Sequence, residues 1–196
     1  MSDTQGVKAQ LRTALRQHRN ALSPSAQQTA AQALLDSVMA LPIWSSAQCI
    51  AVYLASDGEI STGPLVALAR SLGKEVFLPV VSADHHLAFA GWRAEATLTS
   101  NRYNIPEPPR TATRCPAAAL DIIFLPLVGW DSCGGRLGMG GGFYDRTLAG
   151  ISGPLLVGLA HDSQRIELVP QEQWDIRLDY IATDIALHRR QGTPTS

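Results

Sequence analysis

The sequence predicts an α/β fold, a three-layer α/β/α arrangement around a mostly parallel sheet. Short apolar runs rich in Val, Ile and Leu recur along the chain and alternate with segments of helical character. Strands that are apolar throughout are typical of a sheet covered on both faces. The 196 residues fit one domain, and 45% hydrophobic against 17% charged residues exclude a disordered chain. We expect a single domain over residues 1–188 and a flexible tail over residues 189–196.

Two helices are expected first. Residues 8–22 contain no Gly or Pro, and Ser23 followed by Pro24 is typical of an N-cap that begins a second helix, which runs to about Ala40. Residues 48–54 form an apolar run that predicts a buried strand, which ends at a polar loop over residues 56–59. A third helix over residues 61–72 closes at Gly73, and the next strand covers residues 75–81.

The second half of the chain repeats the alternation. Residues 87–92 predict a strand in a hairpin, whereas the prolines of residues 101–116 indicate an extended connection. Residues 121–128 form the most strand-like run, and they lead through a glycine-rich segment to a helix over residues 143–148. Strands at 155–160 and 180–183 bring the expected total to about six or seven.

Composition restricts the partners. The chain has 16 Lys+Arg and 17 Asp+Glu, so it carries no global basic field that would hold nucleic acid. No apolar run reaches the roughly 20 residues of a membrane span, and no apolar leader is visible, so we expect no membrane partner and a cytoplasmic location. The 3 cysteines lack metal or disulfide spacing and are interpreted as reduced thiols.

Glycines gather over residues 134–142. Six of the 16 glycines fall within these nine residues, where even scattering would place about 0.7. Glycine permits positive φ and close approach, so consecutive N–H groups followed by a helix start can point at one anion, with phosphate as the first candidate. The spacing matches neither the Walker A motif nor the dinucleotide-binding fingerprint. The alternative is a tight, mobile turn.

A basic stripe is predicted on the first helix. Lys8, Arg12, Arg16 and Arg19 lie within about 80° of arc if that segment is helical. No acidic residue occurs between Asp3 and Asp36, which favours a polyphosphate as the partner of this stripe. The alternative is the solvated face of an amphipathic helix.

Carboxylates follow or border several predicted strands. Glu59, Asp145, Asp162 and Asp184 stand at strand ends or loops, where α/β sheets place their ligands. Asp145 lies three residues after Gly142, close enough to hold Mg²⁺ between itself and bound phosphates. The alternative for Asp145 is a carboxylate that favours the helix start electrostatically. His161 is interpreted as a structural histidine without a catalytic role, since no nucleophile pattern accompanies it.

The glycine segment resembles a known signature. Residues 136–146, RLGMGGGFYDR, are similar to the glycine loop of 5-formyltetrahydrofolate cyclo-ligases, also called 5,10-methenyltetrahydrofolate synthetases. The resemblance covers nearly the whole chain, because further segments follow in the family's order: Lys8-x-x-Leu-Arg12, Gly58-Glu59-Ile60-x-Thr62, VGLA at 157–160 and DIRLDYIATD at 175–184. Three positions depart from residues found in relatives, namely Met139 (aromatic or basic in many), Phe143 (Tyr in many) and Gly141 (Lys in some).

The resemblance implies a function and a fold shared with CoA-transferase-like and ribose-phosphate-isomerase-like proteins. It implies ATP- and Mg²⁺-dependent conversion of 5-formyltetrahydrofolate to 5,10-methenyltetrahydrofolate, with release of ADP and phosphate. The implied partners are a reduced folate and ATP, and we expect a monomer. Two alternatives remain open: a sugar-phosphate isomerase-like enzyme, and a non-catalytic protein that binds folate or nucleotide.

The resemblance also implies site residues. Catalytic roles would fall to Arg136, Tyr144 and Asp145, and Mg²⁺ would be held by Asp145 and Asp184. The expected folate-binding residues are Leu54, Glu59, Met139, Gly140, Gly141, Gly142 and Phe143. The expected ATP-binding residues are Lys8, Ala9, Gln10, Leu11, Arg12, Arg136, Leu137, Gly138, Met139, Gly140, Gly141, Gly142, Phe143 and Tyr144.

Overall fold

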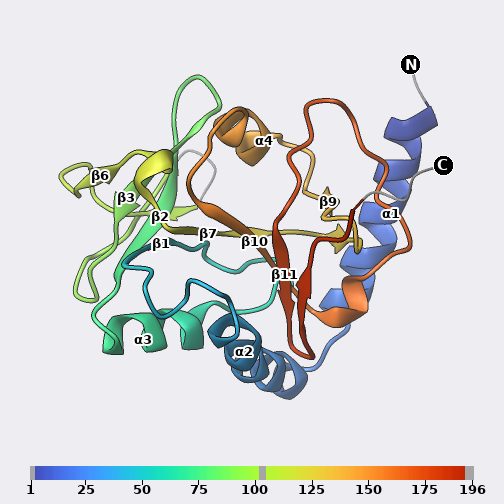
Figure 1. Cartoon of the computed structure of the whole chain (residues 1–196). Coiled ribbons are helices and arrows are strands. Elements are labelled where there is room, and N and C mark those ends of the chain that lie inside the picture. Colours follow the sequence, from blue (N-terminus) through green and yellow to red (C-terminus); the bar gives the residue numbers. More distant parts are fainter. Residues whose placement is uncertain (1–2, 102–104, 193–196) are drawn as a thin grey trace.

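The apolar runs pair into one sheet. The computed structural model describes residues 3–101 and 105–192, and its main sheet has the strand order β12-β11-β10-β7-β1-β2-β3-β6 (Figure 1). The strands from β11 to β2 are parallel, and β12, β3 and β6 join antiparallel at the two edges, so the predicted mostly parallel sheet is confirmed. In that order, the bounds are Leu187–Arg189, Tyr180–Thr183, Leu155–Ala160, Ile122–Pro126, Cys49–Ala51, Glu75–Val81, Leu87–Gly91 and Arg114–Cys115.

Helices cover both faces of the sheet unequally. The two helices α2 (Pro24–Met39) and α3 (Gly63–Ser71) lie together on one face, and the short α4 (Phe143–Leu148) lies on the other (Figure 1). The helix α1 (Asp3–Asn20) stands at the end of the sheet, beside β9 (Arg136–Leu137). It begins earlier than the predicted residue 8. Two 3₁₀ turns complete the set, at Ala117–Ala119 and Asp162–Gln164.

The start of α2 follows the local signal that predicted it. The side chain of Ser23 accepts a hydrogen bond from the backbone N–H of Ala26 at 3.2 Å, which satisfies one of the unpaired donors of the first turn. Pro24 occupies the first helical position, where its missing N–H is not needed. The predicted N-cap is therefore confirmed.

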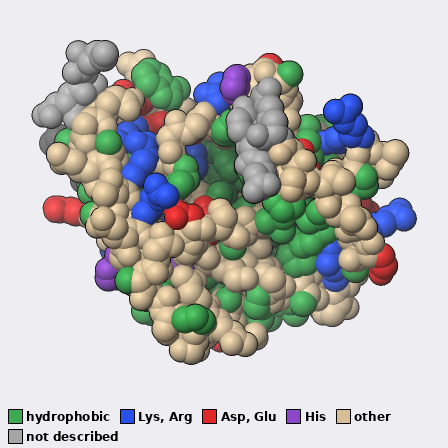
Figure 2. All heavy atoms as spheres, turned by 180° about the vertical axis from the view of Figure 1, so that it is seen from behind, with side chains coloured by type: hydrophobic (Ala, Val, Ile, Leu, Met, Phe, Trp, Pro, Cys, Tyr) green, Lys and Arg blue, Asp and Glu red, His purple; other side chains and the backbone are tan. Residues whose placement is uncertain are grey.

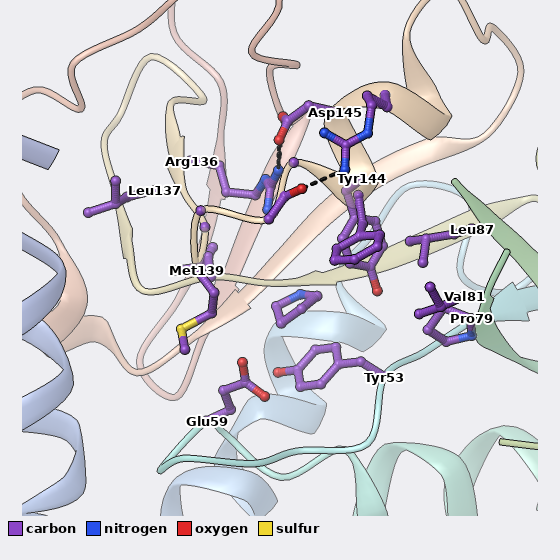
Figure 3. Close-up of a pocket in the computed structure, with 18 of the residues that line it drawn as sticks. Tyr53, Glu59, Pro79, Val81, Leu87, Arg136, Leu137, Met139, Tyr144 and Asp145 are labelled. Atoms are coloured by element: carbon purple, nitrogen blue, oxygen red, sulfur yellow. Dashed lines mark hydrogen bonds and ion pairs between the residues drawn. The ribbon is translucent and has the colours of Figure 1, made fainter. Parts of the chain in front are cut away.

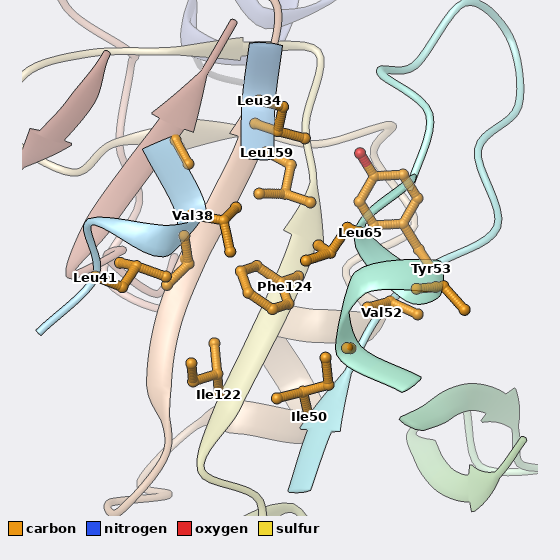
Figure 4. Packing of buried hydrophobic residues seen from close by; sticks show 14 of the residues in the cluster. Leu34, Val38, Leu41, Ile50, Val52, Tyr53, Leu65, Ile122, Phe124 and Leu159 are labelled. Atoms are coloured by element: carbon orange, nitrogen blue, oxygen red, sulfur yellow. The ribbon is translucent and has the colours of Figure 1, made fainter. Parts of the chain in front are cut away.

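The β7 strand explains why the central runs are apolar at every position. Successive side chains of a strand point to opposite faces, so Phe124 packs with the α2 and α3 side chains in one core (Figure 4) while Ile123 and Leu125 enter the core on the other face. All three side chains are fully buried. The partners of Phe124 on the first face include Leu34, Val38, Ile50, Leu65 and Leu159.

A hairpin that the sequence pattern missed extends from β7. It consists of β8 (Gly129–Trp130) and β9 (Arg136–Leu137). Buried Asp131 closes its turn by accepting hydrogen bonds from the backbone N–H groups of Cys133 and Gly135, each at 2.8 Å, and from Val169 at 2.8 Å. A Cβ on Gly135 would lie 2.3 Å from the Asp131 carboxylate, so only glycine fits there. A strand of two residues is too short to show a hydrophobic alternation in the sequence, so the pattern could not predict this hairpin.

The expected extended connection over residues 101–116 contains short strands. β4 (Thr99–Ser100) pairs with β5 (Pro106–Glu107), and β6 joins the main sheet beside β3. The side chain of Glu107 holds this segment to β2 by accepting a hydrogen bond from the backbone N–H of Val81 at 2.8 Å. Residues 102–104 lie outside the described residues. Such a side-chain contact is invisible to a composition pattern.

The first residues of the expected tail belong to the fold. Arg189 belongs to β12 and pairs with Tyr180, and the backbone N–H of Gln191 donates to the Ser132 carbonyl at 2.9 Å. The predicted boundary is therefore wrong for residues 189–192. Residues 193–196 lie outside the described residues.

The strand order reverses direction at β1. The chain adds β2 on one side of β1, and then returns to add β7, β10 and β11 on the other side. In open α/β sheets, ligands bind at the carboxyl ends of the strands where the order reverses. The topology therefore points to a ligand site between the ends of β1 and β7.

Candidate active site

A cavity of about 1070 Å³ opens at that reversal point. Its walls come from the segment after β1, the end of β7, the glycine loop over residues 136–146, and α1 (Figure 3). All of the predicted residues from Arg136 to Asp145 line it, together with Leu54 and Glu59. The volume matches a site for one or two organic ligands rather than a single ion.

Arg136 and Asp145 form an ion pair at the base of the loop. Nη2 of Arg136 lies 2.9 Å from each carboxylate oxygen of Asp145, and the Arg136 side chain is only 5% exposed (Figure 3). Nη1 of Arg136 makes no hydrogen bond to any residue within 3–101 or 105–192. That nitrogen can therefore donate to a ligand while the pair stays intact.

Tyr144 packs beside this pair. The guanidinium carbon of Arg136 lies 5.7 Å from the centre of the Tyr144 ring. Burial is the main cause that raises the pKa of the Tyr144 hydroxyl well above its usual value, so the group stays protonated at neutral pH. The hydroxyl bonds to no other described residue, so it is available as a donor in the cavity.

The glycine loop presents unpaired backbone donors. Gly140 has φ +97° and Gly142 φ +65°, values that favour glycine. The carbonyl of Gly138 accepts a hydrogen bond from Nε of Arg12 at 2.8 Å, and the carbonyl of Gly141 accepts one from Arg146. The backbone N–H groups of residues 139–142 donate no hydrogen bond to any described residue. Free N–H groups in such a turn form a cradle for an anion.

The predicted basic stripe of α1 divides in two. Gln5, Lys8 and Arg12, spaced three and four residues apart, line the cavity. Nζ of Lys8 lies 2.6 Å from Asp175, with both side chains largely buried. Arg16 and Arg19 lie outside the cavity, so the expectation that all four side chains face one polyphosphate is wrong.

Ala9, Gln10 and Leu11 also lie outside the cavity. Each residue turns a helix by about 100°, which rotates these three side chains away from the face that carries Lys8 and Arg12. Ala9 and Gln10 are exposed. Leu11 packs against a small apolar cluster below the β8–β9 hairpin.

Arg19 connects three segments at the edge of the cavity. Its fully buried side chain donates from Nε to the Asp57 carbonyl at 2.7 Å, from Nη1 to the Leu127 carbonyl at 3.0 Å, and from Nη2 to the Asp57 carboxylate at 2.8 Å. Arg16 donates to the same carboxylate at 2.7 Å. The arginine therefore fixes the loop after β1 to α1 and to the end of β7.

That loop presents Glu59 to the cavity. One carboxylate oxygen accepts a hydrogen bond from the Ser56 N–H at 3.0 Å, and the other lies 4.0 Å from Nη2 of Arg19. Burial is the main cause that raises the pKa of Glu59, while the Ser56 bond and Arg19 oppose it. Gly58 has φ +75°, and a Cβ there would lie 2.4 Å from the Asn20 side chain. The loop conformation therefore requires glycine.

The two predicted Mg²⁺ ligands are in different surroundings. Asp145 lines the cavity, whereas Asp184 does not, and the Asp184 carboxylate accepts a hydrogen bond from the Asp162 N–H at 2.7 Å. Among the residues that the structure describes, no group of three or more His, Cys, Asp or Glu could hold a metal. The structure does not bring Asp184 to the glycine loop.

The remaining sequence candidates lie outside the cavity. His161 is buried at the end of β10, and burial lowers its pKa, which favours the neutral ring of a structural histidine. The carboxylate of Asp162 contacts Thr183 at 3.1 Å and His188 at 3.2 Å.

Several cavity residues were not among the site residues that the sequence predicted. They come from strand ends and loops far apart in the chain, so only the folded topology brings them together. They are Tyr53, Pro79, Val81, Leu87, Ile105, Arg146, Trp174 and Asp175.

The fold and the cavity define a class of protein: an α/β enzyme with a glycine- and arginine-lined site for an anionic ligand at the carboxyl ends of its parallel strands. Residues 4–184 match the model of the 5-formyltetrahydrofolate cyclo-ligase family. The chain belongs to the 5-formyltetrahydrofolate cyclo-ligase family.

Characterised relatives agree with this assignment. The chain is 40% identical to the 5-formyltetrahydrofolate cyclo-ligase of Escherichia coli (strain K12) over 174 residues, which cover 86% of this chain and 96% of the relative. It is 38% identical to that of Haemophilus influenzae over 176 residues, which cover 87% and 94%. The NMR structure of Aquifex aeolicus 5,10-methenyltetrahydrofolate synthetase superposes with a TM-score of 0.84 at 29% identity and covers 97% of this chain and 96% of that chain.

Replacement of Asp57 by Asn tests the contact between Arg19 and the loop. The hydrogen bond from Arg16, followed by those from Asn20 and Arg19, holds the pKa of Asp57 well below its usual range. A carboxylate with a lowered pKa stabilises the fold above its unfolded pKa of about 4 and loses that contribution as pH falls. We expect Asp57→Asn to lower the free energy of unfolding at pH 7, measured by urea denaturation, and the difference from wild type to narrow between about pH 4 and pH 2.

Asp84→Asn is the matched control, because that carboxylate is exposed and, among the described residues, contacts Ser82 and His86. It should change the free energy of unfolding much less than Asp57→Asn does. A difference between wild type and Asp57→Asn that stays constant from pH 7 to pH 2 would contradict the interpretation.

Proposed function

We propose that this chain converts 5-formyltetrahydrofolate to 5,10-methenyltetrahydrofolate at the expense of ATP, with release of ADP and phosphate. The glycine loop is the main structural support for this proposal. Its free N–H groups over residues 139–142 lie between Arg12 and Arg136 in one cavity with the buried carboxylate of Glu59. An anion cradle and a carboxylate in one cavity suit a polyphosphate and a pterin ring, respectively.

The triphosphate would lie against the loop. Lys8 and Arg12 approach from α1, and Arg136 approaches from β9, so cations stand on two sides of the cradle. Charge-assisted bonds from guanidinium and ammonium groups to phosphate are among the stronger polar contacts in proteins. The cavity thus offers the neutralising charge that a polyphosphate needs.

The folate would occupy the other half. Apolar side chains of Leu54, Pro79, Val81 and Leu87 form its walls, in the part of the cavity where Tyr53 and Glu59 lie (Figure 3). The Glu59 carboxylate would accept hydrogen bonds from the amide and amino groups of the pterin. The apolar walls suit the flat rings of the folate.

The reaction needs positioning and charge neutralisation rather than a protein nucleophile. The formyl oxygen attacks the γ-phosphorus and ADP leaves; N10 then attacks the activated carbon and loses its proton, and phosphate leaves with the former formyl oxygen. Arg136 and the protonated Tyr144 would donate hydrogen bonds to the phosphoryl oxygens as charge develops on them. The loop would hold the two reactants in line.

Mg²⁺ would be held by Asp145 together with the phosphates. This ion keeps several waters and takes one or two carboxylates plus phosphate oxygens, so a single carboxylate beside the loop fits it. The Asp145 carboxylate bonds to Arg136 and to the Ile176 N–H at 3.3 Å, and among the described residues no N–H of α4 is its partner. Mg²⁺ supplies charge that offsets repulsion between the phosphates and the attacking oxygen.

The setting is the cytoplasm, and the active species is a monomer that acts on small molecules. Within the described chain, no helix is long and apolar enough to cross a membrane. Basic and acidic side chains are interspersed on the face seen in Figure 2, rather than gathered into one field. This face therefore offers no continuous basic patch for nucleic acid.

Incubation with ATP and 5-formyltetrahydrofolate tests the function directly. We expect the absorbance of the methenyl product to rise and ADP to be released only when the folate is present. Equal ATP turnover with and without folate would contradict the proposal. Ligand binding without turnover would indicate a binding protein, and turnover of a sugar phosphate without ATP would indicate an isomerase.

Arg12→Ala tests the α1 contact with phosphate. Loss of a charge-assisted hydrogen bond should raise the KM for ATP by about tenfold or more and leave the KM for folate nearly unchanged. Arg16→Ala is the matched control on the same helix, since its side chain pairs with Asp57 outside the cavity. Equal KM values for ATP in the two variants would exclude Arg12 as a contact of the phosphates.

Asp145→Asn tests the metal assignment. The variant keeps the shape of the side chain and removes its charge, so turnover should fall by orders of magnitude and half-maximal activity should need more Mg²⁺. Asp175→Asn is the control, because it breaks the other cavity ion pair, with Lys8. Near-normal turnover of Asp145→Asn at low Mg²⁺ would exclude Asp145 as a ligand.

A further inference from the structure

One large aromatic side chain at the cavity, that of Trp174, belongs to none of the hydrophobic clusters of the described residues. Trp174 is 66% exposed and yet lines the cavity. Trp44 and Trp130 are buried, at 5% and 0% exposure, and Trp92 is half-buried against Arg70. Exposed tryptophan beside a ligand site is a common binding element, because the ring is flat, rigid and apolar.

The segment that carries Trp174 is fixed to the site on its C-terminal side. The carboxylate of the next residue, Asp175, accepts hydrogen bonds from Nζ of Lys8 at 2.6 Å and from the Glu172 N–H at 2.9 Å. The backbone N–H of Ile176 donates to Asp145 at 3.3 Å. Trp174 is therefore held next to the side chains that face the proposed phosphate site.

The cavity has two ends, and only one of them remains for the nucleobase. Tyr53 and Glu59 follow β1, and the apolar Pro79 and Val81 belong to β2. The segment with Trp174 is instead joined to α1 by the ion pair of the next residue, Asp175, with Lys8. A triphosphate on the glycine loop whose γ-phosphate faces the folate must extend its base away from the folate. That direction leads to α1 and the segment with Trp174.

We propose that Trp174 is the platform on which the purine ring of the nucleotide stacks. This inference rests on the proposed use of ATP and adds the residue that holds the base. Stacking on an aromatic ring accepts any base and favours the larger purine surface. Trp174 therefore contributes to nucleotide affinity and to preference for purine over pyrimidine triphosphates, while the phosphate contacts remain with the loop.

Binding measurements with two probes separate base contacts from phosphate contacts. ATP and inorganic tripolyphosphate are titrated by calorimetry into wild type, Trp174→Ala and Trp174→Phe, without folate. We expect Trp174→Ala to weaken ATP binding about tenfold, Trp174→Phe to restore most of the affinity, and tripolyphosphate binding to stay unchanged. ATP should quench the tryptophan fluorescence of wild type, and Trp174→Phe should lose that quenching.

Leu168→Ala is the matched control, since Leu168 is 63% exposed in the same connection between β10 and β11 and does not line the cavity. It should bind both probes as wild type does. Unchanged ATP affinity in Trp174→Ala, or an equal loss for tripolyphosphate, would overturn the stacking role alone. Failure of wild type to bind either probe would overturn the proposed use of ATP as well.

Discussion

The buried guanidinium of Arg19 is the contact on which the geometry of the cavity depends. The α1 helix stands at the end of the sheet rather than within its layers (Figure 1). A fully buried arginine joins it to Asp57 and to the Leu127 carbonyl. Three hydrogen bonds from one planar group fix direction as well as distance. The helix that carries Lys8 and Arg12 is thereby set against the ends of β1 and β7.

Two of the cations that line the cavity are paired with carboxylates. Lys8 is paired with Asp175, and Arg136 with Asp145, and all four side chains are largely buried. A buried cation without a partner would be strongly unfavourable, so each carboxylate lets its cation stay in place before a ligand arrives. The Lys8–Asp175 pair also joins α1 to the segment before β11, and the Arg136–Asp145 pair joins β9 to α4.

The sequence predicted the elements that depend on local pattern, and it could not predict those that depend on distant contacts. Apolar runs indicated the central strands, Ser23 and Pro24 the second helix, and the glycines the loop, since each signal is read within a few residues. A helical wheel placed Arg19 beside Arg12, yet it cannot show that one turns into the protein and the other into a cavity. The partner of Asp145, the β8–β9 hairpin and the position of Trp174 arise from contacts between segments far apart in the chain.

The edges of the sheet have a consequence for association between copies of this chain. Both terminal strands are antiparallel and very short: β6 covers two residues and β12 three. Arg114 lies in β6, directly before Cys115 and Pro116, and β12 ends at Arg189. Short edges that carry positive charge, with a proline next to one of them, offer a neighbouring molecule little unpaired backbone to extend, and like charges repel a second edge. The short, positively charged edge strands therefore protect the protein from aggregation through strand pairing.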